Sequence, residues 1–103
     1  MSPLLDQLEL PTGLVEAVLA AARRHGMEAP RLFGSMVTGD AGPESDVDLL
    51  VRLGEGRGWN DLLAFCEELE DSLGRPVDVV PEDGLSPYLR ERVLAEAVEF
   101  GAN

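Results

Sequence analysis

The segment Ser45-Asp46-Val47-Asp48-Leu49-Leu50-Val51 decides how this chain folds, because apolar residues run almost without interruption from Val47 to Leu53. Such a run is typical of a strand that is covered on both faces. Side chains alternate along a strand, so Asp46 and Asp48 lie on one face at its beginning, and Val47 lies on the other. The sequence therefore predicts a buried strand that begins with two converging carboxylates.

Helix and strand patterns alternate on both sides of this segment. Apolar residues at helical spacing indicate helices over 14–25, 60–73 and 87–99. Short apolar runs indicate further strands over 31–33 and 77–80. A strand, a helix and a strand in succession form a right-handed parallel crossover, and the compact turn after Phe33 suits an antiparallel neighbour. We expect a two-layer α+β fold with a small mixed β-sheet and flanking helices.

A third carboxylate, Asp78, lies among apolar residues in the strand over 77–80. Parallel pairing with the strand of Asp46 and Asp48 brings Asp78 to their level. Like charges that lie close together are costly unless a cation lies between them, and oxygen ligands suit Mg²⁺. A lone Asp-x-Asp is more often a solvated turn, but the apolar surroundings of Asp78 favour a cation site.

Gly34 and Ser35 directly follow the short strand that ends at Phe33, and ten residues separate them from Asp46. Glycine allows the backbone to approach a phosphate closely, and serine adds a hydroxyl donor. The plainer alternative is an ordinary Gly-Ser turn. Together with the three acids, this pair predicts a phosphate and metal site.

Length and composition limit the class of protein. The 103 residues suit one domain over 1–103, with residues 1–11 as a loosely ordered lead. Cys66 is the single cysteine, and the sequence shows neither a signal peptide nor a membrane span, so we expect a cytoplasmic protein. The formal net charge of -12 repels a phosphate backbone and disfavours direct nucleic-acid binding.

Three motifs, Leu32-Phe33-Gly34-Ser35, Ser45 to Val51 and Val77-Asp78-Val79-Val80, resemble those of the minimal nucleotidyltransferases over about residues 14–99. These proteins are the small one-domain branch of the DNA polymerase beta superfamily. The resemblance implies the nucleotidyltransferase fold and transfer of a nucleoside monophosphate, with ATP as the expected donor, to a hydroxyl. It also implies that Gly34 and Ser35 hold the triphosphate, that Asp46 and Asp48 bind two Mg²⁺ ions, and that Asp78 binds the metal that activates the acceptor.

The same resemblance implies a partner. Minimal nucleotidyltransferases often act as antitoxins of HEPN-domain ribonuclease toxins, and some adenylylate a tyrosine of the toxin. Thr38 departs from the family pattern, because members commonly carry a basic residue there; Arg52 or Arg57 would either compensate or be surface charges. The alternative function is therefore a non-catalytic antitoxin that blocks its partner by binding alone. An RNA or aminoglycoside transferase is disfavoured by the net charge and by the lack of a substrate domain.

Overall fold

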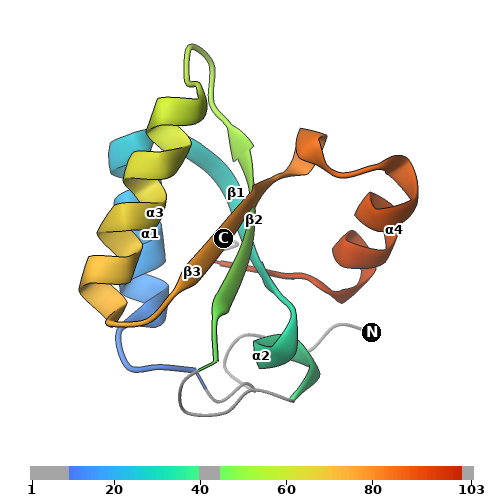
Figure 1. Cartoon of the computed structure of the whole chain (residues 1–103), viewed down its shortest axis with the longest axis horizontal. Coiled ribbons are helices and arrows are strands. Elements are labelled where there is room, and N and C mark those ends of the chain that lie inside the picture. Colours follow the sequence, from blue (N-terminus) through green and yellow to red (C-terminus); the bar gives the residue numbers. More distant parts are fainter. Residues whose placement is uncertain (1–9, 40–44, 101–103) are drawn as a thin grey trace.

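The computed structural model describes residues 10–39 and 45–100 (Figure 1). Most of the lead expected over residues 1–11 lies outside these ranges. In chain order the elements are α1 (Leu14–His25), β1 (Met27–Phe33), α2 (Ser35–Thr38), β2 (Val47–Leu53), α3 (Trp59–Leu73), β3 (Val77–Pro81), the 3-10 turn η2 (Glu82–Gly84), α4 (Pro87–Glu96) and β4 (Val98–Glu99).

The four strands form one mixed sheet in the order β3-β2-β1-β4. β2 pairs parallel with β3 and antiparallel with β1, and β4 pairs antiparallel with the other edge of β1. The predicted mixed sheet and both predicted pairings of β2 are confirmed. The central place of β2 in the sheet explains why its residues are mostly apolar. Leu49 and Leu50 point to opposite faces of the sheet, and both are fully buried.

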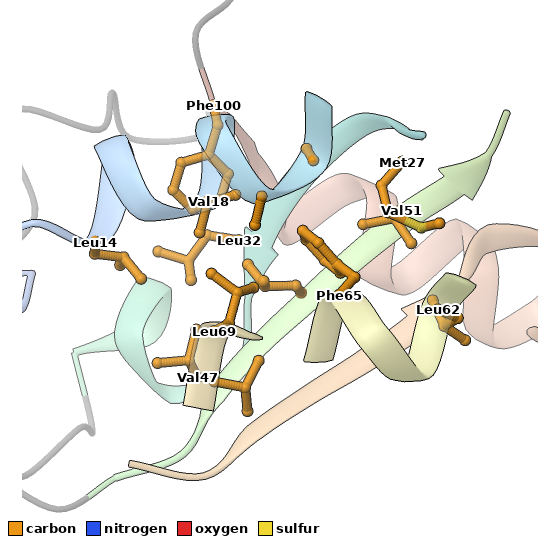
Figure 2. Close-up of a cluster of buried hydrophobic side chains, with 14 of the residues drawn as sticks. Leu14, Val18, Met27, Leu32, Val47, Val51, Leu62, Phe65, Leu69 and Phe100 are labelled. Atoms are coloured by element: carbon orange, nitrogen blue, oxygen red, sulfur yellow. The ribbon is translucent and has the colours of Figure 1, made fainter. Parts of the chain in front are cut away.

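The hydrophobic core lies between the sheet and the two helices α1 and α3, which cover the same face (Figure 1). Figure 2 shows Val18 of α1 and Phe65 and Leu69 of α3 meeting side chains of the sheet, and all three are fully buried. α1 ends at Gly26 and α3 at Gly74, both with φ near +70°, a conformation that glycine adopts without strain. α4 lies on the opposite side of the sheet (Figure 1).

The end of the chain differs from the prediction of a helix that continues to Glu99. α4 ends at Glu96, and Ala97 has extended backbone angles, φ -68° and ψ 146°. Val98 then pairs with Leu32 of β1, and the Phe100 N–H donates to the Pro30 carbonyl at 3.1 Å. The strand forms because it places Val98 and Phe100 in buried positions, whereas no residue of α4 itself is buried.

None of the helices within residues 10–39 and 45–100 has the length and apolar character needed to cross a membrane.

Candidate active site

The site predicted from the sequence lies where β1 ends and β2 and β3 begin. Asp48 of β2 is the register partner of Asp78 in the parallel strand β3 and of Phe33 in the antiparallel strand β1. Because parallel partners point to the same face, the carboxylates of Asp48 and Asp78 lie on one face of the sheet. This face is the one opposite α1 and α3, since Val47 and Leu49 point into the core. The expected juxtaposition of Asp48 and Asp78 is confirmed; their chemical roles stay predictions.

Negative charge is concentrated around Asp48. Its side chain is half-buried, whereas Asp46, directly before β2, and Asp78 are exposed. Burial raises the pKa of Asp48, and the charges of Asp78, Asp46 and Glu96 raise it further. Three acids, from the approach to β2, from β3 and from α4, therefore act on Asp48, and a cation would relieve this repulsion.

The three acids predicted as metal ligands, Asp46, Asp48 and Asp78, are not assembled into a cage. Within the ranges that the structure describes, no three side chains of His, Cys, Asp or Glu are grouped so that they could hold an ion. The chemistry of the donors nevertheless fits Mg²⁺, since Asp46, Asp48 and Asp78 supply carboxylate oxygens at a place of uncompensated negative charge.

Gly34 joins β1 to α2 and lies directly against Asp48. Its backbone angles are φ 80° and ψ -151°, a combination that is almost restricted to glycine. A Cβ at this position would collide with the Asp48 carboxylate. The conformation turns the chain into the short helix α2, which begins with the half-buried Ser35. Gly34 and Asp48 therefore lie side by side, and the role of Gly34 and Ser35 in holding a phosphate stays a prediction.

The Gly34 N–H points to a residue that the sequence reasoning missed. It donates a hydrogen bond to Oε1 of Glu96, 2.7 Å away, at the end of α4. The sequence analysis predicted a helix over 87–99 and assigned no role to Glu96, and 62 positions separate the two residues. One signal was available: a glutamate in the last turn of a helix is unfavourable with the helix dipole, which suggests another reason for it.

The two arginines considered as substitutes for a basic residue at Thr38 lie elsewhere. Arg57 contacts Asp61 at 3.3 Å and lies beside Gly26, at the beginning of β1 rather than at its end. Arg52 is four residues after Asp48 along β2, and its Nε lies 3.8 Å from Oε2 of Glu82. Thr38 itself is exposed at the end of α2. Arg52 and Arg57 are therefore surface charges in this structure.

The fold is that of a minimal nucleotidyltransferase. A solved structure assigned to this class shares 49% identity with the chain, with a TM-score of 0.73 over 81% of this chain and 85% of that one. The chain belongs to the nucleotidyltransferase domain family, whose model matches residues 19–99. It is accordingly a nucleotidyltransferase of the EC 2.7.7 class.

Two further proteins are similar to this chain, one in sequence and one in fold. Protein adenylyltransferase MntA of Thermococcus cleftensis is 35% identical over 89 residues, which cover 82% of this chain and 90% of that protein. The MNT antitoxin in a complex with a tri-AMPylated HEPN toxin of Shewanella oneidensis shares the fold, at 18% identity and a TM-score of 0.69. That match covers 91% of this chain and 74% of the other.

Proposed function

We propose that this nucleotidyltransferase moves AMP from ATP to a hydroxyl of a HEPN-domain toxin, with release of pyrophosphate and the hydroxyl proton, depends on Mg²⁺ and acts as the antitoxin of that toxin. The observation that carries the proposal is the parallel register of Asp48 and Asp78 with Gly34 packed against Asp48. The name of the Thermococcus relative supports adenylyl transfer to a protein, and the Shewanella complex supports a HEPN partner.

The chain's own residues have distinct parts in this reaction. Asp46 and Asp48 would hold Mg²⁺, and Asp78 would hold it on the side of the attacking hydroxyl. When bound, the metal ions lower the pKa of the acceptor hydroxyl and neutralise charge on the phosphates. Gly34 and Ser35 would position the triphosphate through a backbone N–H and a hydroxyl, so that the α-phosphate faces the acceptor.

The test is transfer of label from ATP in the presence of Mg²⁺ and the candidate HEPN protein. Asp46→Asn/Asp48→Asn should abolish transfer, because neutral amides cannot replace two carboxylates as ligands. Asp71→Asn is the matched control, since it removes an exposed aspartate from α3, beyond the far face of the sheet. Transfer that survives in the double variant would contradict the proposed roles.

A second function is favoured by two observations. Thr38 replaces the basic residue common in the family, and Glu96 accepts the hydrogen bond of the Gly34 N–H. Both weaken the case for triphosphate binding and favour an antitoxin that acts by steric blocking alone. In that case the chain would inhibit the toxin without transferring label, and Asp46→Asn/Asp48→Asn would inhibit equally well.

A further inference from the structure

We propose that Glu96 is a built-in anion that blocks the nucleotide site and must be displaced by the triphosphate before AMP can be transferred. The inference rests on the proposed function and adds to it a residue that sets nucleotide affinity.

The geometry of Gly34 carries the first step. The Glu96 carboxylate already accepts the Gly34 N–H at 2.7 Å, a short distance that is typical of charge-assisted hydrogen bonds. A carboxylate and a phosphate present the same kind of anionic oxygen to a donor. Because one N–H supports one short hydrogen bond, a phosphate oxygen at Gly34 has to take the place of Glu96.

The charges around Glu96 make this exchange feasible. Among the residues that the structure describes, Glu96 takes part in no ion pair with an arginine or histidine. It interacts electrostatically with Asp48, itself close to Asp46 and Asp78. Within residues 10–39 and 45–100, the hydrogen bond from the Gly34 N–H holds the Glu96 carboxylate among like charges, and repulsion assists its departure.

The attachment of α4 allows Glu96 to leave. α4 has no buried residue, and Tyr88 and Leu89 in its first turn are 71% and 47% exposed. The helix lies apart from α1 and α3, on the other side of the sheet (Figure 1). Elements with few buried apolar contacts open at low cost, so a shift of α4 can accompany displacement of Glu96.

The first experiment measures binding of a non-hydrolysable ATP analogue with Mg²⁺ by calorimetry. Glu96→Ala should bind about tenfold more tightly than the wild type, because the phosphate no longer competes with a charge-assisted hydrogen bond. Glu96→Gln, which keeps an acceptor without the charge, should bind with intermediate affinity. Glu91→Gln is the matched control, since it removes an exposed charge from the same helix, and its affinity should equal that of the wild type.

The second experiment measures hydrogen exchange of the Gly34 amide without nucleotide. Exchange should be slow in the wild type and faster in Glu96→Ala, and the analogue should slow it again in the variant. This readout reports the contact itself and needs no catalysis.

The outcomes separate the two proposals. Equal or weaker affinity in Glu96→Ala, with the analogue still bound by the wild type, overturns the role of Glu96 and leaves the proposed function intact. Absence of binding to the wild type and both variants overturns both. If circular dichroism shows that Glu96→Ala is unfolded, Glu96→Gln decides, because it preserves size and hydrogen bonding.

Discussion

Gly34 is the residue at which backbone conformation and site chemistry meet. Its φ of 80° and ψ of -151° place the chain where only glycine is comfortable, and its Cα lies against Asp48. Gly39, at the end of α2, also has a positive φ, 89°, but a Cβ there would meet no atom of the described residues within 4 Å. Gly39 lies in the left-handed helical region, whereas the conformation of Gly34 is more strictly limited to glycine, so an alanine at Gly34 meets both a stricter backbone restriction and a collision.

We predict that Gly34→Ala destabilises the protein more than Gly39→Ala. The left-handed conformation alone costs a non-glycine residue about 1–2 kcal/mol, which is the loss expected for Gly39→Ala. Gly34→Ala adds a collision with Asp48 and should lose about 3 kcal/mol or more. Urea unfolding measures the free energy of unfolding of both variants, and equal losses would contradict the larger cost expected at Gly34.

Glu68 gives the protein a pH dependence at the junction of α1 and α3. It accepts hydrogen bonds from Arg24 and lies 2.9 Å from Nε2 of His25. The pKa of Glu68 is lowered to about 2, mainly by the hydrogen bond from Arg24 and to a smaller extent by that from His25. Because the folded-state pKa lies below the unfolded value of about 4.3, the contribution is complete above that value and is lost as the pH falls toward 2.

We predict that Glu68→Gln lowers the Tm at pH 7 and that its difference from the wild type shrinks steadily between about pH 4.3 and pH 2. Glu67→Gln removes an exposed glutamate next to it and serves as the control for the change in net charge. Thermal scans across this pH range measure the difference. A difference that stays constant with pH would contradict the assignment.

At the residue scale, the positions of the acids could be predicted, whereas the sequence offered one weak signal for Glu96 and none for its contact with Gly34. Asp48 and Asp78 lie in two strands that are recognised by their apolar runs, and the helix between them implies a parallel crossover. The sequence near each residue therefore predicts that the two acids lie at the same level of the sheet. The contact between Gly34 and Glu96 depends on where α4 ends after the whole sheet has formed. No periodic pattern in the sequence predicts that Gly34 and Glu96 come into contact.

β4 is the element that the sequence predicted wrongly. Val93 and Ala97 have helical spacing, which favoured a longer helix, yet Val98 and Phe100 also alternate with Glu99 as in a strand. The strand wins because it pairs with the free edge of β1 and buries Phe100 to 4% exposure. A helical and an extended pattern overlap here, and only the presence of a free edge decides between them.

β2 and α3 were predicted closely for the opposite reason. β2 begins and ends at the expected residues, and α3 begins one residue before the expected Asn60. β2 is one apolar run that stops at Gly54, and α3 has one helical spacing of apolar residues that stops at Gly74. No competing pattern exists within them.

We predict that Phe100→Ala destabilises the protein by about 3–5 kcal/mol, because it removes a core side chain and loosens β4. Leu89→Ala, on the exposed first turn of α4, should change the free energy of unfolding by less than about 0.5 kcal/mol. Chemical denaturation of both variants checks the difference. A small effect of Phe100→Ala would mean that the last residues contribute little to the core.

At the scale of the whole molecule, the net charge of -12 opposes folding through self-repulsion. We predict that the Tm rises as NaCl increases from about 20 mM to about 500 mM, because salt screens this repulsion. MgCl₂ at the same ionic strength should raise the Tm of the wild type further, but not that of Asp46→Asn/Asp48→Asn. Equal responses of the two proteins to MgCl₂ would argue against a specific ion site.

The turn from Gly54 to Gly58 follows the end of β2 that pairs with the beginning of β1, whereas Gly34 follows the end of β1, so the turn and Gly34 lie at opposite ends of the sheet. Glu55 and Gly56 are exposed, and Gly56 faces open space. A fluorescent reporter or an affinity peptide inserted between these two residues would therefore leave the chemistry undisturbed. The same spot offers an attachment point from which the enzyme could be immobilised with its acids facing the medium.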